Sequence, residues 1–166
     1  MSLADVGSER ARTTTWEDPV ATAEHGLRLS GAEYIAALIA GEVPPPPIAV
    51  TLGFEVIEAS EGRAVFACEA GEHLYNPIGS VHGGVAATLL DSATGCAVHT
   101  LLPAGVGYAT TDLHVTFVRP IGRDTGRIVC TGEVLHAGRR VASAEGRLVD
   151  GDGRLLAHAT ATCLLT

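Results

Sequence analysis

The chain has 166 residues, 46% of them hydrophobic and 4% aromatic, with a formal net charge of −8 and a pI near 5.2. This length fits one domain with a single buried core, and the acidic balance argues against nucleic acid or an anionic membrane as the principal partner. Residues 1–75 hold 12 acidic residues and 4 arginines, whereas residues 76–166 hold 7 of each. An anionic ligand, if there is one, is expected on the second half, where acidic and basic residues balance. All eleven basic residues are arginines, which genomic base composition explains, although arginine is also the better fork for phosphate groups.

The cysteine and histidine patterns indicate neither disulfides nor metal. No positively charged segment followed by an apolar run opens the sequence, so no secretory signal is predicted. The seven histidines form no HExxH motif or paired ligand spacing, so we expect no metal site. The four cysteines are far apart and contain no CxxC pair, which favours reduced thiols in a cytoplasmic protein.

Residues 1–47 are predicted to form an acidic N-terminal extension. Its first 28 residues are polar and rich in Thr and Glu, so we expect them to be loose or only locally ordered. The segment Ser30-Gly-Ala-Glu33 has the form of a capping box and predicts a short helix over 31–40, with Gly41 as its C-terminal cap. Residues 44–47 are four prolines, which predict a stiff extended spacer. A proline-rich ligand for an SH3-type domain is the alternative, disfavoured by the lack of flanking specificity residues.

Residues 48–166 show the pattern of strands around one helix. Residues 54–59 and 64–70 flank a glycine-containing turn and predict a hairpin. Four further antiparallel strands are expected over 108–119, 128–136, 140–149 and 155–164, with tight glycine turns at 137–139 and 150–153.

Residues 85–102 are the least polar stretch, and their length is near the minimum for a membrane span. The stretch contains Asp91 and His99 and has no basic flank, so a helix buried in the core is favoured. Its many small residues make that helix slender enough for a sheet to wrap around it. The order of elements predicts an α+β fold, with one antiparallel sheet curled around one long central helix.

Asp91 is the most informative residue of this helix. A carboxylate within an apolar helix costs free energy unless it is paired, hydrated or functional, and the pattern alone supports a structural and a functional role equally. His82, Gly83 and Gly84 come just before the helix, where glycines let a ligand approach the backbone and free N–H groups attract negative charge. Alone, these three residues are a weak signal, because two glycines before a helix more often form only a turn.

The sequence of residues 76–91, Asn-Pro-Ile-Gly-Ser-Val-His-Gly-Gly-Val-Ala-Ala-Thr-Leu-Leu-Asp, resembles the signature of the PaaI-type, phenylacetate-pathway branch of the hotdog-fold acyl-CoA thioesterases. Residues 110–120, Thr-Thr-Asp-Leu-His-Val-Thr-Phe-Val-Arg-Pro, are similar to the next strand of that branch, and the hairpin at 138–145 fits as well. The similarity covers residues 48–166. The spacing Asn-x5-His-Gly-Gly-x6-Asp is far more specific than any of its parts.

The resemblance implies a homo-oligomer, a dimer or a homotetramer built from two dimers, with each active site between two subunits. By similarity, the Gly83 N–H of one chain polarises the thioester carbonyl, and Asp91 of the other chain acts as general base or nucleophile. The resemblance also implies that Asn76 orients the water or the carboxylate, that His82 shapes the loop or contacts the thioester, and that Thr110 assists the water.

Coenzyme A belongs to the implied substrate, an acyl-CoA or aryl-acyl-CoA, and no cofactor is expected. Candidate partners for its phosphates are Arg119, Arg139 and Arg140, which lie near or in turns, and Gly84 is a further candidate contact. For each arginine the alternative is an exposed, solubilising side chain.

Two other functions stay open at this point. A non-catalytic acyl-CoA sensor would not need the acid at position 91, so Asp91 speaks against that function. A hydratase or dehydratase typically pairs a histidine with an acid in a different local motif, so the set Asn76, His82 and Asp91 fits it poorly. Serine-hydrolase chemistry is disfavoured because Ser80 and Ser92 lack a GxSxG elbow.

Overall fold

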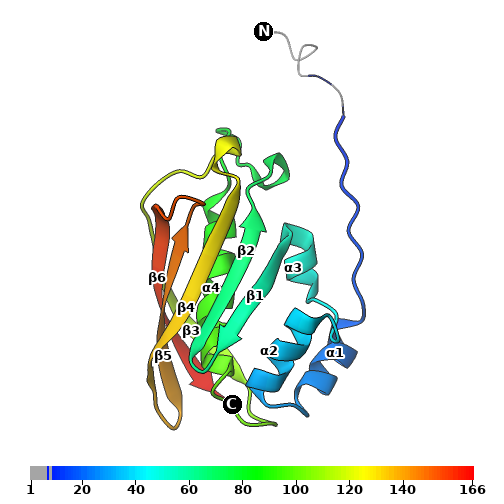
Figure 1. Ribbon diagram of the computed structural model, residues 1–166, viewed down its shortest axis with the longest axis vertical. Coiled ribbons are helices and arrows are strands. Elements are labelled where there is room, and N and C mark those ends of the chain that lie inside the picture. The colour runs from blue at the N-terminus through cyan, green and yellow to red at the C-terminus, as the bar shows by residue number, and fades with distance from the viewer. Residues whose placement is uncertain (1–6, 8) are drawn as a thin grey trace.

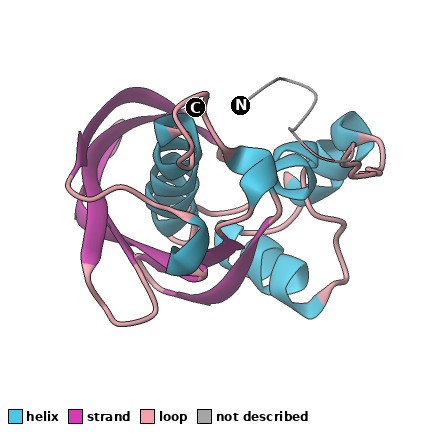
Figure 2. Cartoon of the chain, turned by 90° about the horizontal axis from the view of Figure 1, so that it is seen from above, coloured by secondary structure: helices cyan, strands magenta, loops and turns pink. Residues whose placement is uncertain are grey.

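The computed structural model describes residue 7 and residues 9–166. Six antiparallel strands form one sheet in the order β1-β2-β4-β5-β6-β3, and the sheet curls around the long helix α4 (Gly83–His99), as Figures 1 and 2 show. The predicted α+β architecture is therefore confirmed. The strands are β1 (Phe54–Ser60), β2 (Arg63–Glu69), β3 (Tyr108–Phe117), β4 (Arg127–Ala137), β5 (Val141–Val149) and β6 (Leu155–Leu165).

The helix predicted over residues 31–40 is present as α2 (Gly31–Ala40). Ser30 Oγ accepts a hydrogen bond from the Glu33 N–H at 3.3 Å, and Glu33 Oε2 accepts one from the Ser30 N–H at 2.8 Å. This is the predicted capping box, and Gly41, with φ of 72°, ends the helix in the left-handed conformation as expected. A further short helix, α1 (Pro19–Gly26), precedes α2 and is capped by the Asp18 carboxylate.

The expectation of an extended spacer through Pro47, followed directly by strands, is wrong over one short segment. Residues 47–52 form α3 (Pro47–Leu52), with Pro47 as its first helical residue and Pro46 as its N-cap. Proline is well tolerated there because its missing N–H would have had no partner inside the helix. Gly53, with φ of 77°, then ends α3. Two single-turn 3₁₀ helices, Glu72–Leu74 and Arg123–Thr125, lie in the loops.

Helix α4 lies directly against the backbone of the sheet. Gly132 of β4 and Gly146 of β5 are paired across the sheet beneath it. A Cβ at Gly132 would overlap the Ala93 carbonyl, and one at Gly146 would come within 2.9 Å of the Leu90 side chain. The predicted buried central helix is therefore confirmed. No helix in the described part of the chain combines the length and apolar character that crossing a membrane requires.

The two edges of the sheet differ. Helix α2 packs against the β1 edge, whereas β3, the other edge strand, contains no buried residue. Leu113 and Val115 of β3 are half-buried, whereas Phe117, near the end of the same strand, is 58% exposed. A register shift between Thr110 and Asp112 marks a β-bulge in this edge strand.

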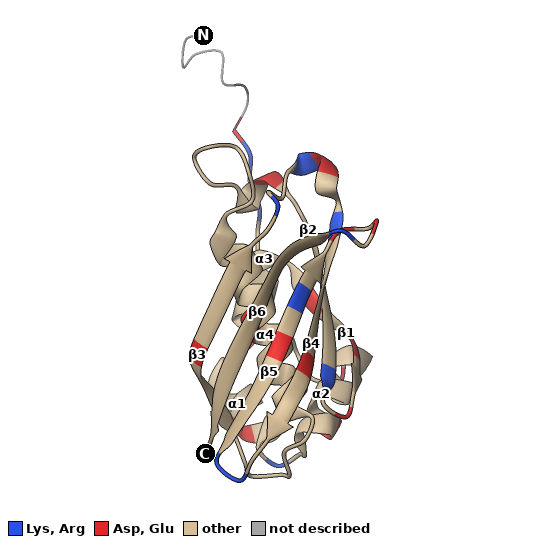
Figure 3. Ribbon diagram, turned by 90° about the vertical axis from the view of Figure 1, so that its left-hand side faces the viewer, with Lys and Arg blue, Asp and Glu red and all other residues tan. Residues whose placement is uncertain are grey.

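Positions of acidic and basic residues are scattered along the strands of the sheet (Figure 3). Arg63 on β2 pairs with Glu133 on β4 at 3.5 Å, and Arg127 on β4 pairs with Glu55 on β1 at 3.4 Å. Exposed ion pairs of this kind contribute little to stability. The core and the candidate site therefore lie on the inner face, around α4.

Candidate active site

Asp91 lies in the middle of α4 and is half-buried. Its Oδ1 atom is buried and accepts no hydrogen bond within the described chain. Leaving a buried acceptor unsatisfied costs about 1–3 kcal/mol, so this carboxylate does not serve the stability of its own helix. The structural alternative, in which Asp91 pairs locally through this oxygen, is not what the structure shows.

A cavity of about 780 Å³ opens over Asp91. From α4 it is lined by Asp91, Cys96 and His99, and from β3 by Tyr108 and Thr110. Helix α2, the proline segment and α3 supply much of the remaining wall, together with apolar side chains of β1 and β2. This volume lies within the range typical of pockets for small molecules.

Burial favours the uncharged form of three titratable groups that line the cavity, Cys96, His99 and Tyr108. It raises the pKa of the Cys96 thiol to about 12, although a hydrogen bond with Tyr108 opposes the shift. Burial also holds the pKa of Tyr108 well above its usual range and lowers the pKa of His99. Because the thiolate is the nucleophilic form of cysteine, Cys96 is not a suitable nucleophile. Asp91 is left as the candidate base or nucleophile.

Thr110 lines the same cavity as Asp91, so the structure brings these two predicted residues together. On the neighbouring strand β6 its pairing partner is Cys163. The bulge follows immediately, and there Thr111 donates from Oγ1 to the Thr162 carbonyl at 3.1 Å. The bulge changes the register just beyond the one predicted β3 site residue, a placement common beside active sites.

A second group of predicted residues gathers at the N-terminus of α4. His82 is the N-cap, and its Nδ1 accepts a hydrogen bond from the Gly84 N–H at 2.9 Å. The N–H of Gly83 donates to no group in residues 7 and 9–166, and it points from the positive end of the helix dipole. His82, Gly83, Phe117 and Arg119 line a pocket of about 290 Å³ here, and a Cβ at Gly83 would lie 3.2 Å from the Phe117 ring.

These two groups are separated within one chain. Gly83 and Asp91 are eight residues apart on α4, which is about 12 Å along the helix axis. A hydrogen-bond donor and a base acting on one carbonyl must both lie within about 3 Å of the reacting atoms. One chain therefore cannot bring both to a single thioester.

Asn76 holds the loop that leads into α4. Its Oδ1 accepts from the N–H groups of Ile78 at 3.0 Å and Ser80 at 3.2 Å, and its Nδ2 donates to Ser80 Oγ at 3.0 Å. Asn76 does not line the cavity over Asp91 in this chain. Its predicted action on a water or a carboxylate stays a prediction, and the contacts observed are those of a loop organiser.

The three candidate phosphate partners lie at opposite ends of the sheet. Arg119 lines the pocket of Gly83 and donates to the Leu155 carbonyl at 2.6 Å. Arg139 and Arg140 lie in the β4–β5 turn, where the Arg140 carbonyl accepts from the Leu165 N–H at 2.9 Å. Leu165 pairs with Tyr108, at the far end of β3 from Arg119.

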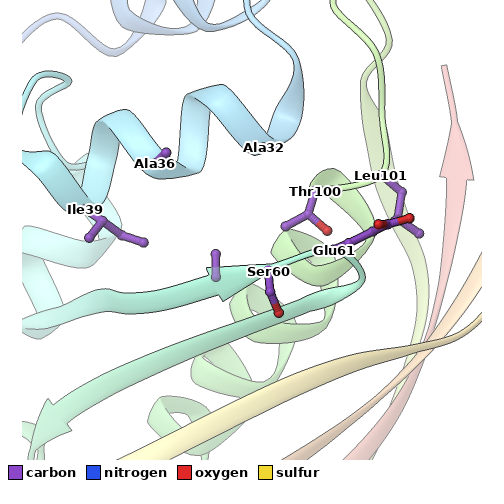
Figure 4. Close-up of a pocket in the computed structure, with 8 residues that line it drawn as sticks. Ala32, Ala36, Ile39, Ser60, Glu61, Thr100 and Leu101 are labelled. Atoms are coloured by element: carbon purple, nitrogen blue, oxygen red, sulfur yellow. The ribbon is translucent and has the colours of Figure 1, made fainter.

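A further groove of about 380 Å³ lies between α2 and the β1–β2 turn (Figure 4). Ala32, Ala36 and Ile39 line one side of it. Thr100 also lines it, but its hydroxyl is satisfied, donating to the Ala97 carbonyl at 2.7 Å and accepting from the Gly62 N–H at 2.8 Å. No residue predicted for the site contributes to this groove. No cluster of metal-ligating side chains is found among the residues that the structure describes.

Comparison with known proteins places this arrangement in a family. The family model described as "Thioesterase superfamily" matches residues 78–157. A candidate esterase of Halobacterium salinarum is 38% identical over 119 residues, which are 69% of this chain and 77% of that protein. A phenylacetic acid degradation-related protein of Ralstonia eutropha has a solved structure with a TM-score of 0.71 and 32% identity, covering 79% of this chain and 98% of that one.

The chain belongs to the thioesterase superfamily.

Within this superfamily, the 1,4-dihydroxy-2-naphthoyl-CoA hydrolase of Listeria monocytogenes is 26% identical over 107 residues, which are 64% of this chain and 85% of that enzyme. The E. coli PaaI protein shares the fold, with a TM-score of 0.70 at 23% identity over 82% of this chain and 94% of that one. The predicted resemblance to PaaI-type hotdog proteins is confirmed, and so is the prediction of a thioester hydrolase.

Some residues of the cavity were not predicted. Tyr34 and Leu38 of α2 and Val43 beyond it face the same space as Asp91, as do Tyr108 and His99. The sequence predicted α2 from its capping box but carried no signal for which element it packs against.

Proposed function

We propose that the protein hydrolyses the thioester of an acyl-CoA to a free acid and CoA, at a site shared by two subunits. The observation that carries the proposal is the buried, unpartnered Oδ1 of Asp91 beside a cavity large enough for an acyl group. The thioester-hydrolase relatives, one of them named as a CoA-ester hydrolase, support the choice of substrate.

The shared site is supported by the free edge of β3. Thr110, near one end of β3, lines the cavity of Asp91, whereas Phe117, at the other end, packs against Gly83. Antiparallel pairing of two β3 strands about Leu113 and His114 would place Thr110 opposite Phe117 of the partner subunit. Asp91 would then lie level with Gly83 of the partner subunit, which overcomes the separation of about 12 Å within one chain.

In the proposed reaction Asp91 acts as a general base. It takes a proton from water as the water oxygen attacks the thioester carbonyl carbon, and the resulting oxyanion accepts a hydrogen bond from the N–H of the partner's Gly83. When the C–S bond breaks, the proton held by Asp91 passes to the leaving thiolate of CoA. Direct attack by the Asp91 carboxylate, through an anhydride that water then hydrolyses, is the alternative.

The remaining roles follow from position. Thr110 would hold the water beside Asp91, and Asn76 and His82 would fix the loop that presents Gly83. Arg119 would approach the CoA phosphates beside Gly83, with Arg139 and Arg140 contributed across the subunit boundary.

The test is thiol release from a panel of acyl-CoAs, measured for the wild type and for Asp91→Asn side by side. Loss of the general base should lower kcat by about 10²–10⁴-fold while the oligomer stays intact on size-exclusion chromatography. Saturable binding of CoA esters with no turnover on any of them would sink the hydrolase proposal and favour a sensor. Undiminished turnover by Asp91→Asn would remove Asp91 from the mechanism.

A further inference from the structure

The N-terminal extension forms one wall of the cavity over Asp91. Tyr34 and Leu38 of α2 line it, followed by Val43 and the proline segment 44–46. Ile48 and Ala49 of α3 continue the same wall. The cavity that contains the candidate carboxylate therefore owes much of its shape to residues that lie before the sheet.

This wall is held firmly against the rest of the molecule. The Gly31 N–H donates to the Leu102 carbonyl at 3.0 Å, and a Cβ at Gly31 would overlap the His99 carbonyl, so α2 begins in backbone contact with the end of α4. The ring of His99 lies between those of Tyr34 and Tyr108, at centroid distances of 5.7 and 5.5 Å. These contacts join the extension to both elements that carry the candidate site.

The far end of the wall is anchored as well. The Arg12 guanidinium donates to the carbonyl oxygens of Thr51 at 2.6 Å and Val50 at 3.1 Å, at the C-terminal end of α3. Gly53 leaves room for this guanidinium, because a Cβ there would lie 2.8 Å from Arg12 Nη2. The wall is therefore tied down at both α2 and α3.

The chemistry of the lining defines what this space can hold. Four of the chain's seven Phe, Tyr and Trp residues line it: Tyr34, Phe54, Phe66 and Tyr108. Its acidic side chains are Glu17, Glu55 and Asp91, and no arginine lines it within the described chain. A buried anionic group would find no basic partner here and would meet carboxylates, which is strongly unfavourable.

We propose that the extension is the acyl-binding wall of this enzyme, that Leu38 on this wall helps to set the size of the acyl group accepted, and that the wall selects uncharged acyl groups with a sizeable apolar body. The proposal rests on the proposed thioester hydrolysis and adds to it the substrate class and the element that sets it. Acyl groups that carry a free carboxylate are disfavoured by the negative charge of the lining.

Leu38 allows a matched test because α2 also has a face outside the cavity. Leu38→Ala enlarges the cavity and Leu38→Trp narrows it. Ala36→Leu instead adds bulk on the side of α2 that faces the groove of Figure 4. The measurement is kcat/KM for butyryl-, octanoyl-, dodecanoyl-, phenylacetyl- and malonyl-CoA, with thermal melting to confirm that each variant is folded.

Leu38→Trp should lower the dodecanoyl-to-butyryl ratio of kcat/KM by at least about tenfold, since a single methylene in an apolar pocket changes specificity by about 10–200-fold. Leu38→Ala should raise that ratio, and Ala36→Leu should leave it unchanged. Malonyl-CoA should be the poorest substrate of the wild type. Identical profiles for the two Leu38 variants, or malonyl-CoA turned over as well as butyryl-CoA, would overturn the proposal.

A binding measurement separates this proposal from the hydrolase proposal. Non-hydrolysable thioethers, butyl-CoA and dodecyl-CoA, are titrated calorimetrically into the wild type and both Leu38 variants. Suppose that no acyl-CoA is hydrolysed but that Leu38→Trp still weakens the binding of dodecyl-CoA at least tenfold more than the binding of butyl-CoA. The proposed reaction is then wrong, and the proposed acyl-binding role of the extension is supported. Equal changes in affinity for both ligands would disprove the acyl-binding role of the extension, whether or not hydrolysis occurs.

Discussion

The two halves of α4 carry opposite kinds of chemistry. Its first turn offers the free N–H of Gly83 and the positive end of the helix dipole, in a pocket of about 290 Å³ beside Arg119. Its middle offers the Asp91 carboxyl group, above an aromatic cavity of about 780 Å³. In the proposed mechanism one helix would supply both the donor that polarises the carbonyl and the base, but within one chain they lie too far apart to act on one thioester. In a two-fold assembly, each helix can serve two sites.

After Asp91→Asn, removing the donor from the first half of α4 gives the largest expected effect. Gly83→Pro deletes the N–H, yet proline is accepted at the first position of a helix, and His82, with φ of −61° and ψ of 135°, has the backbone that a residue before proline requires. Loss of one such donor should lower kcat by about 10²–10³-fold. The matched control is Gly83→Ala, which keeps the N–H and should show a far smaller decrease in kcat. Equal losses in both variants would point to displacement of Phe117 rather than to the hydrogen bond.

Mixed oligomers of the two variants test whether Gly83 of one subunit and Asp91 of another form one active site. Asp91→Asn and Gly83→Pro chains are unfolded together and refolded, so that mixed oligomers form. If each site takes one half from each chain, a mixed dimer keeps one intact site, and thiol release should rise well above that of either variant alone. No recovery, with mixed oligomers confirmed by mass spectrometry of tagged chains, would place both halves in one subunit.

A smaller effect is expected where the extension meets the second half of α4. Gly31→Ala puts a methyl group against the His99 carbonyl and should lower the free energy of unfolding by about 1–3 kcal/mol, because neither backbone can move without disturbing α2. Gly151→Ala is the control, since a Cβ there has no neighbour within 4 Å. Chemical denaturation measures both. An unchanged midpoint for Gly31→Ala would mean that α2 is not fixed to α4.

The smallest expected effect is a pH dependence of stability from His99. Burial lowers the pKa of His99, so below the usual value of 6.5 the unfolded chain binds a proton that the folded chain resists. The stabilising contribution of neutral His99 is therefore present above about pH 6.5 and is lost as the pH falls toward the lowered pKa. His99→Phe should flatten the change in unfolding free energy between about pH 7 and pH 5.5. An identical dependence of the unfolding free energy on pH in wild type and variant would show that His99 does not contribute to the pH dependence of stability.

The backbone was predicted well wherever a local signal sufficed. Ser30, Glu33 and Gly41 placed α2 to the residue, because capping is local chemistry. Asp91 stood out from sequence because an acid in an apolar helix is rare, and the structure adds that its buried Oδ1 has no hydrogen-bond partner in the described part of the chain. Helix α3 was missed because four prolines suggested an extended chain, although the last of them sits where a helix tolerates proline.

Features that depend on distant contacts were not predictable. Nothing in the sequence near Leu38 indicates that it faces Asp91, 53 residues later, because that contact depends on how α2 packs against β1 and α4. Likewise, nothing in the sequence indicates that His82 accepts from the N–H of Gly84 while that of Gly83 has no partner among residues 7 and 9–166. The separation of the predicted arginines to opposite ends of the sheet is also a result of strand register.

The glycine pair beneath α4 limits how such an enzyme can be re-engineered. Gly132 and Gly146 let the helix rest on bare backbone, so any larger residue at either position would push the helix outward and carry Asp91 with it. Diversity libraries aimed at new substrates should therefore leave this contact untouched. The side chains of α2 that face the cavity are the better place to randomise, since they can change shape without shifting the helix that carries the acid.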